Sequence, residues 1–163
     1  MKALALSILV LLAWSSPAAS ETIQGRWKLI AAEDMRPDGT VGRLPWGAHP
    51  AGTIVVQDGS CYLQIMSTDV PSFPAGQQST VEQMKAALLS TYIAYTGPCT
   101  IDEAAGKVTL QVQGAWRPDY VGTEQVRYFR FEGGKMYFGP GQPNTQRGRG
   151  ESLQRRLTLV REN

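Results

Sequence analysis

The sequence is poor in the residues from which metal and catalytic centres are usually built. Its 163 residues include one histidine and two cysteines. A zinc site needs three or four ligands, and no spacing of histidine, cysteine and carboxylate residues in the chain matches one. The chain also has no Gly-x-Ser-x-Gly elbow and no glycine-rich loop that could hold a phosphate. These absences argue against a metal site, a triad hydrolase and a nucleotide enzyme, and we expect no cofactor.

The chain has little excess charge. Lysine and arginine number 16 against 14 aspartates and glutamates, and the formal net charge is +2. This near neutrality gives no electrostatic reason to expect nucleic acid as a partner. The clusters Arg147/Arg149 and Arg155/Arg156 are better explained as solvated loop charges than as nucleic-acid contacts. A hydrophobic content of 42% is ordinary for one folded domain.

No hydrophobic run is long enough to cross a membrane. The longest, Ala3 to Trp14, falls well short of the roughly 20 residues that a spanning helix needs. It follows the positive Lys2 and precedes small residues, which is the pattern of a secretory signal peptide cleaved after Ser20. We therefore predict a signal peptide over residues 1–20 and a mature domain over 21–163, periplasmic or secreted and without a membrane span. An uncleaved anchor is the alternative.

Export changes what the two cysteines imply. In an oxidising compartment an isolated pair forms a disulfide more often than a redox or metal site, so we expect a bridge between Cys61 and Cys99. A bridge over so long a loop would stabilise the fold by roughly 3–4 kcal/mol. The alternative is two buried free thiols on strands that do not meet.

Among the residues that are present, Gly25-Arg26-Trp27 tells most about the fold. An indole buries most of its area and still needs a partner for its N–H group. A glycine two residues earlier lets another piece of backbone come close to the ring. A small β-barrel can bury such an indole where the first strand closes one end of the core. The last strand, with its arginines, passes alongside at that point. We therefore assign Gly25 and Trp27 a structural role in closing the barrel.

One helix is predicted, over about residues 79–92. Ser79-Thr80-Val81-Glu82 is a capping box that opens it. Its apolar stripe consists of Val81, Met84, Leu88 and Tyr92. We expect this helix to lie across the barrel as a plug or lid.

The remainder of the chain has a β pattern. Asp58-Gly59 marks a two-residue hairpin, whose turn needs positive φ at both positions. Eight strands are predicted, over residues 27–32, 52–57, 60–66, 93–102, 107–115, 123–131, 135–138 and 152–161. Connections after the helix are mostly short hairpins, which favours a closed antiparallel β-barrel of eight or slightly more strands over a two-sheet sandwich. Long loops are expected over residues 33–50 and 139–150.

Several segments together resemble a known family. They are Gly25-Arg26-Trp27, Glu33-Asp34, Asp38-Gly39, Pro50-Ala51-Gly52, Asp58-Gly59, Gln64-Ile65-Met66, Tyr92-Ile93-Ala94-Tyr95-Thr96-Gly97, and Tyr120-Val121-Gly122-Thr123-Glu124-Gln125-Val126-Arg127 with Phe129. In these the chain resembles the bacterial and fungal lipocalin-like domain family over almost the whole mature length. The resemblance implies an all-β, lipocalin-like barrel. It implies little about function, because the family is named for its shape, and the cysteine pair departs from its pattern.

The segment 123–131 indicates a binding site. One side of this strand carries an amide, a guanidinium and two aromatic rings, from Gln125, Arg127, Phe129 and Phe131. If that side points inward, Arg127 is costly in an apolar cavity unless it is paired or meets an anionic ligand, and its fork of donors matches a carboxylate. The alternative is a structural network that pairs Arg127 with Glu33, Asp102 or Glu124.

Further aromatic residues are candidates for the ligand wall. Trp116 and Tyr120 flank a connection at one barrel end, where they could form a rim over a ligand or simply pack the loop. Tyr95 is the remaining candidate. Trp46 and His49 lie in the first long loop, where exposed aromatic side chains would serve as a portal, although a lone histidine is more often a surface group.

These observations favour an exported binding protein over an enzyme. We expect a small, mainly hydrophobic molecule, with room for a carboxylate, in the barrel calyx. One alternative is a cofactor-independent isomerase or cyclase that uses Glu124, Tyr92 or Tyr95 in the same cavity. Another is a barrel filled with side chains that acts as an envelope interaction module, which predicts an exposed apolar patch and no ligand-sized cavity. Monomer and dimer both stay open.

Overall fold

The computed structural model describes residues 21–69, 80–148 and 150–162, so the predicted signal peptide lies outside the described residues. Within these ranges the chain forms eleven strands, one α-helix and one short 3₁₀ helix. In chain order they are β1 (Gly25–Met35), β2 (Val41–Arg43), β3 (Ala51–Gln57), β4 (Ser60–Met66), α1 (Val81–Thr91), β5 (Tyr92–Asp102), β6 (Lys107–Gln111), β7 (Gly114–Ala115), η1 (Pro118–Tyr120), β8 (Glu124–Glu132), β9 (Lys135–Gly139), β10 (Asn144–Gly148) and β11 (Glu151–Arg161).

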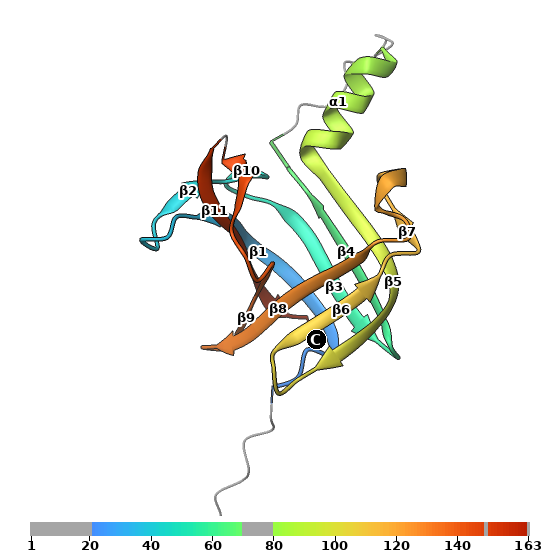
Figure 1. Ribbon diagram of the computed structural model, residues 1–163, viewed down its shortest axis with the longest axis vertical. Helices are drawn as coiled ribbons and strands as arrows, with labels where there is room; N and C mark the ends of the chain where they lie inside the picture. Colours follow the sequence, from blue (N-terminus) through green and yellow to red (C-terminus); the bar gives the residue numbers. More distant parts are fainter. Residues whose placement is uncertain (1–20, 70–79, 149, 163) are drawn as a thin grey trace, which may run out of the picture.

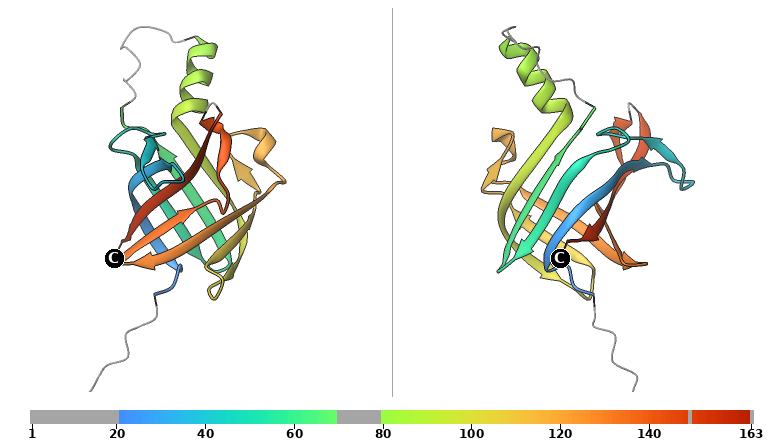
Figure 2. Two further views of the ribbon diagram at one scale, coloured as in Figure 1. Left: turned by 60° about the vertical axis from the view of Figure 1, so that its left-hand side comes forward. Right: turned by 180° about the vertical axis from the view of Figure 1, so that it is seen from behind.

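Eight of the strands form a closed antiparallel barrel (Figures 1 and 2). Their order around the wall is β1, β3, β4, β5, β6, β8, β9 and β11, and β11 pairs back with β1. The shorter β2, β7 and β10 add to individual strands outside this circuit. The predicted all-β architecture of eight or slightly more strands is confirmed, because only a closed circuit gives both β1 and β11 a partner on each side.

The hairpin between β3 and β4 has the predicted turn. Asp58 and Gly59 both have positive φ, at 50° and 73°, and Gln57 faces Ser60 across the turn. The turns of β5–β6 and β8–β9 lie at the same end of the barrel, which we call the closed end (Figure 1). The opposite end, which carries α1, is called the open end.

The predicted disulfide is confirmed near the closed end. Cys61 of β4 and Cys99 of β5 are bonded, with their Cα atoms 5.7 Å apart. Cys61 faces Gly97 in the register, so the bridge runs diagonally between two paired strands. The alternative of two free thiols is therefore wrong.

Trp27 lies in the core at the closed end and is only 2% exposed. Its Nε1 donates to the carbonyl of Ile23 at 2.8 Å. Phe131 covers the indole at a ring distance of 5.6 Å, and the guanidinium of Arg161 lies 4.3 Å from the ring centroid. Gly25 has a φ of +110°, and a Cβ there would lie 2.8 Å from Nη1 of Arg161. The close approach that Gly25 permits is thus to a side chain of the last strand.

The helix does not cover the barrel, and its prediction as a lid is wrong. α1 runs without a break into β5, leaving no loop to fold it back, and it projects beyond the open end (Figures 1 and 2). Its cap is one residue later than predicted: the Thr80 hydroxyl accepts from the N–H of Gln83, whose side chain accepts from the N–H of Thr80. Val81 and Met84 of the predicted stripe are exposed. Among the described residues no helix is long and apolar enough to span a membrane.

Two predicted strands and two predicted loops also need correction. β1 continues to Met35, three residues further than predicted, because its charged end pairs with β11. The predicted strand 107–115 is divided into β6 and β7, since the N–H of Val112 bonds to Thr123 whereas the N–H of Gln113 bonds to Thr96 on the other neighbour. The predicted loops 33–50 and 139–150 contain β2 and β10.

Candidate functional site

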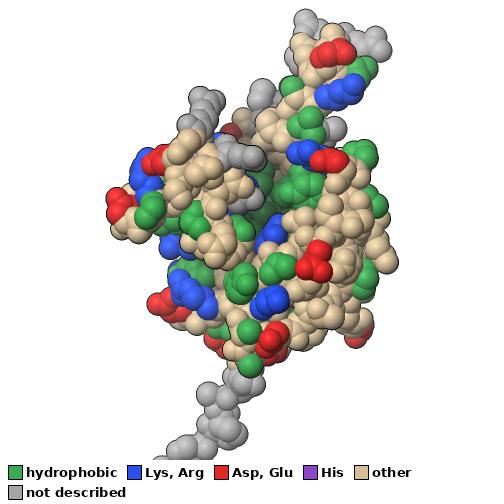
Figure 3. Space-filling view, viewed as in Figure 1, with side chains coloured by type: hydrophobic (Ala, Val, Ile, Leu, Met, Phe, Trp, Pro, Cys, Tyr) green, Lys and Arg blue, Asp and Glu red, His purple; other side chains and the backbone are tan. Residues whose placement is uncertain are grey.

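The barrel wall is incomplete toward the open end. β8 pairs with β9 only over Tyr128–Glu132, whereas Glu124–Arg127 pairs with β6 alone. β9 ends at Gly139, and the upper part of β11 pairs instead with β10. Figure 3 shows the molecule hollowed in this region, with hydrophobic side chains in the wall of the hollow. The calyx therefore opens both at its end and toward β10.

Arg127 lies on the inner side of β8, and its guanidinium has neutral hydrogen-bond partners. Nη2 donates to Oε1 of Gln125 at 2.8 Å, and Nη1 donates to the carbonyl of Val126 at 2.7 Å. The guanidinium carbon is 5.8 Å from the ring centroid of Tyr95 on β5. Within the described part of the chain no carboxylate forms an ion pair with Arg127.

The three carboxylates considered as partners of Arg127 are engaged elsewhere. Glu33 bonds to Arg156, Glu124 accepts from the amide of Gln111, and Asp102 accepts from the N–H of Ala105. The structural network expected as the alternative for Arg127 is therefore absent from the described residues. A partly buried guanidinium without a counter-ion is available to an anion.

Three of the predicted ligand-binding residues meet in one cavity. Gln125, Arg127 and Tyr95 line an enclosed space of about 20 Å³, together with apolar residues that include Leu63 and Phe138. This space holds about one water molecule. The enclosed part of the calyx is thus a mainly apolar floor that Gln125 and Arg127 border, and any larger volume lies in the open half above it.

The two phenylalanines lie deeper. Phe129 is buried and packs 5.7 Å from Phe131, which in turn covers Trp27. Phe131 therefore belongs to the packing of the closed end. The structure does not bring it to the cavity that Arg127 lines.

Trp116 belongs to an aromatic cluster at the open end. Its ring meets Tyr120 edge-on at 4.6 Å, and Tyr120 lies 6.1 Å from Tyr95. Arg117 lies 5.8 Å from both the Trp116 and the Tyr120 ring, and bonds to Asp119. The Nε1 atom of Trp116 is buried and has no hydrogen-bond partner among the described residues. This indole is therefore a donor that lacks an acceptor.

The comparison with known families agrees with this geometry. A family model described as a lipocalin-like domain matches residues 24–161. The chain belongs to the lipocalin-like domain family. No curated protein and no solved structure matches it. Membership establishes the lipocalin-like barrel fold and leaves the ligand to be argued from the residues of this domain.

The lipocalin-like domain also carries a buried ion pair that the sequence analysis missed. Asp34 is 0% exposed and accepts two hydrogen bonds from Arg155, at 2.7 and 2.8 Å. Arg43 approaches the same carboxylate to 3.7 Å. A β-bulge between Leu29 and Ala31 reverses the alternation of β1, which is why Asp34 points inward. Opposite charges at the end of the first strand and near the start of the last strand were the available indication.

Two predictions at this end are wrong. Arg155 and Arg156 are not solvated loop charges, because they lie in β11 and bond to Asp34 and Glu33. Trp46 is not exposed as a portal residue: it is 6% exposed and lies under the guanidinium of Arg155, 4.5 Å away. His49 is exposed, as a surface histidine would be.

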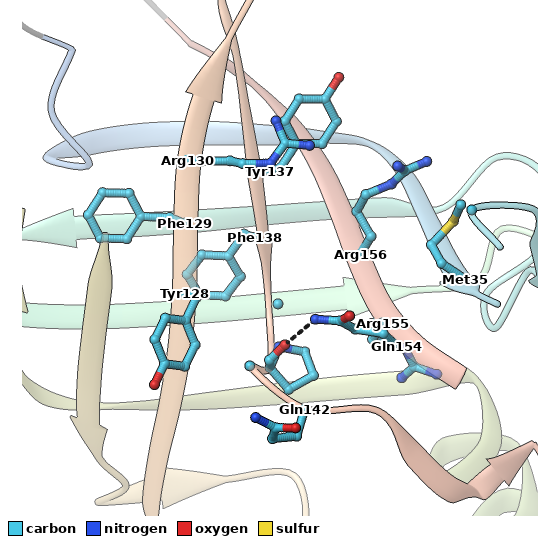
Figure 4. A pocket seen from close by; sticks show the side chains of 14 residues that line it. Met35, Tyr128, Phe129, Arg130, Tyr137, Phe138, Gln142, Gln154, Arg155 and Arg156 are labelled. Atoms are coloured by element: carbon cyan, nitrogen blue, oxygen red, sulfur yellow. Dashed lines mark hydrogen bonds between the residues drawn. The ribbon is translucent and has the colours of Figure 1, made fainter. Parts of the chain in front are cut away.

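A larger hollow, of about 630 Å³, lies outside the barrel. It is bordered mainly by outward-facing residues of β8, β9 and β11 and by the loop after β9 (Figure 4). Of the predicted ligand-binding residues only Phe129 borders it. Among the described residues no group of three or more histidine, cysteine, aspartate and glutamate side chains could hold a metal ion.

Proposed function

We propose that this lipocalin-like domain is exported after removal of residues 1–20 and binds a small, mainly apolar molecule with an anionic end in the open half of its calyx. The observation that carries the proposal is Arg127, an inward guanidinium whose hydrogen-bond partners among the described residues are an amide and a backbone carbonyl. The Cys61–Cys99 bridge is compatible with an oxidising compartment.

Arg127 has hydrogen-bond donors that the described part of the protein does not use. A guanidinium carries five N–H groups in a planar fork that matches a carboxylate, and the structure uses two of its nitrogens. A partly buried cation without a counter-ion is energetically unfavourable. A carboxylate that pairs with Arg127 would therefore stabilise the charged side chain. The buried Nε1 of Trp116 offers another donor at the open end.

The volume of the calyx constrains how such a molecule lies. Sites for drug-sized ligands usually measure roughly 300–1,000 Å³, whereas the enclosed floor holds about 20 Å³. The anionic end therefore reaches the floor at Gln125 and Arg127, and the apolar part occupies the hollow toward the open end. Burial of that part contributes roughly 25 cal/mol per Å².

Decanoate and decanol test this assignment, because they share an apolar chain and differ in the charge of the end. Titration calorimetry should show Arg127→Leu weakening decanoate at least about tenfold, as expected for a hydrogen bond to a charged group, with decanol unchanged. Arg26→Leu is the matched control, since Arg26 is an exposed arginine at the closed end paired with Glu162. Equal decanoate affinity in wild type and Arg127→Leu would refute the role of Arg127.

A second candidate is the filled barrel that acts as an interaction module. The small enclosed volume favours it, and so do exposed apolar side chains at the open end: Val41, Leu44, Met66, Val81, Met84, Leu89 and Val121. Native mass spectrometry of the gently purified protein separates the two candidates. A bound small molecule supports the calyx function, and a bound protein with no small molecule supports the module.

The isomerase or cyclase alternative is weakened by geometry. Glu124, one of its acid–base candidates, is exposed and bonds to Gln111 on the outer side of the wall. Of the other two candidates, Tyr95 lines the calyx cavity and Tyr92 does not.

A further inference from the structure

The outer hollow shares one lining residue, Phe138, with the calyx cavity, and its other lining residues are its own. Its 630 Å³ is bordered by three arginines, two tyrosines and two glutamines, and by no carboxylate. The arginines are Arg130, Arg155 and Arg156. Arg155 turns inward to Asp34, which leaves Arg130 and Arg156 as the cations available on the outer face. We call this hollow the outer groove.

Gly139 and Gly141 let the border of the outer groove pack closely against its neighbours. A Cβ on Gly139 would lie 2.2 Å from the carbonyl oxygen of Arg155, and one on Gly141 would lie 2.4 Å from the ring of Tyr128. Neither position can therefore carry a side chain that fills the space without a shift of its neighbours. Gln154 donates to the carbonyl of Pro140 at 3.1 Å and fixes the loop (Figure 4). The loop after β9 thus forms a closely packed border of the groove.

Two guanidinium groups converge on the floor of the groove from opposite walls. Arg130 of β8 lies 4.1 Å from the ring centroid of Tyr137, and Arg156 of β11 lies 5.7 Å from the same centroid. These cation–π contacts hold both guanidinium groups above β9 (Figure 4). Both can therefore face a single bound group.

The carboxylates that pair with these arginines do not block the groove. Glu132 bonds to Arg130 and Glu33 bonds to Arg156, and neither carboxylate lines the hollow. The Arg130–Glu132 pair is more than half exposed on both sides, and exposed pairs of this kind contribute little to stability. Each guanidinium also keeps a nitrogen that no described residue uses: Nη2 of Arg130 and Nη1 of Arg156. An anion that enters the groove can accept hydrogen bonds from these nitrogens without breaking an ion pair that contributes much to stability.

The walls offer a flat surface and polar groups beside the two cations. Tyr128 is 45% exposed, and Gly141 packs against its ring. Gln142 borders the groove with an amide that can donate and accept hydrogen bonds. The volume falls within the range of small-molecule sites.

We propose that the outer groove is a second binding site, for an acidic saccharide. Its carboxylate, sulfate or phosphate lies between Arg130 and Arg156, its ring packs against Tyr128, and its hydroxyls bond to Gln142. None of these four residues lines the calyx cavity, so the proposal does not rest on a ligand in the calyx.

Backbone amide NMR titrations with glucuronic acid, glucose 6-phosphate, glucose and inorganic phosphate test the proposal. The two acidic sugars should shift the amides of residues 128–130, 137–142 and 154–156, and glucose should shift them far less. Arg130→Gln/Arg156→Gln should weaken the acidic sugars at least about tenfold. Arg26→Gln, which alters an exposed and paired arginine at the closed end, should leave their affinity unchanged.

Three outcomes would overturn the proposal. The first is no shift in the groove with either acidic sugar, and the second is an equal loss of affinity in Arg26→Gln. The third is that inorganic phosphate binds as tightly as glucose 6-phosphate and that Tyr128→Ala changes the affinity for neither. The groove would then bind a bare anion and not a saccharide. Well-dispersed spectra of each variant verify that it is folded.

Discussion

An arginine of β11 stacks on a tryptophan at each end of the barrel, and the two pairs are stabilised differently. Arg161 lies 4.3 Å from the Trp27 ring at the closed end, and Arg155 lies 4.5 Å from the Trp46 ring at the open end. Arg161 donates to the backbone carbonyls of Gln24 and Thr22, whereas Arg155 donates to the carboxylate of Asp34. The first pair depends on packing and neutral acceptors, and the second on a buried charge.

The difference shows what each end can tolerate. At the closed end the indole of Trp27 fills the core and the arginine covers it, so loss of volume is the main hazard. At the open end the carboxylate of Asp34 has no exposure to water, so loss of its counter-charge is the main hazard. Arg127, on the floor of the calyx, has no carboxylate partner among the described residues, which is why we propose a ligand for it.

The largest expected effect comes from removing volume at the closed end. Trp27→Ala should lower the free energy of unfolding by about 3–5 kcal/mol, because it deletes a core indole and leaves a cavity. Trp46→Ala should cost less, since Trp46 lies in a loop beside a side chain that keeps its ion pair. Urea denaturation of both variants measures the difference. Equal losses of unfolding free energy in the two variants would contradict the difference proposed between the two ends.

Removing charge at the open end should have the next largest effect. Asp34→Asn leaves Arg155, whose side chain is 15% exposed, without its counter-charge, and we expect a loss of about 3 kcal/mol. Arg161→Gln, at the closed end, should cost about 1 kcal/mol, because its carbonyl acceptors are neutral. The double variant Asp34→Asn/Arg155→Gln should recover part of the first loss in the same assay. No recovery would mean that Asp34 acts by packing and not by charge.

A third arginine–tryptophan pair involves an arginine exposed to solvent, and changing it should have the smallest effect on the protein. Arg117 stacks on Trp116 and bonds to Asp119, and this bond lowers the pKa of the Asp119 carboxyl below 3.8. Because the folded-state pKa is the lower one, the pair is fully formed above about pH 4 and is lost as the pH falls through that pKa. Side-chain carboxyl NMR against pH checks the shift in wild type. Arg117→Gln should return the pKa of Asp119 toward 3.8, and an unchanged pKa would exclude Arg117 as its cause.

The elements that local patterns determine were predictable. The Asp58-Gly59 turn, the strands on either side of it and the closure of the barrel follow from turn chemistry and alternation, and the structure shows them where expected. The start of α1 shifts by one residue because Thr80 offers the same capping chemistry as Ser79. Its direction could not be predicted, because a capping box and an apolar stripe do not specify what the helix packs against.

The charged residues at the open end show where prediction from the sequence fails. Glu33 and Asp34 have the composition of a loop, and their partners Arg156 and Arg155 lie more than 120 residues away. The bulge after Leu29 decides which of the two points inward, and nothing in the local sequence marks it. For Arg127 the alternation predicted the inward side of β8, but only the tertiary structure shows that no carboxylate among the described residues pairs with it.

The position of the disulfide has a consequence for handling and re-engineering the chain. The bridge joins β4 and β5 near the closed end, whereas α1, which lies between these strands in the sequence, projects from the open end. Between Cys61 and Cys99 the sequence has a single trypsin site, Lys85, and it lies in α1. A chain cut there consists of two pieces tied together by one reducible bond, with every barrel strand uncut. The projecting segment is therefore a place where the polypeptide can be opened, exchanged or given new ends while the bridge keeps β4 and β5 together.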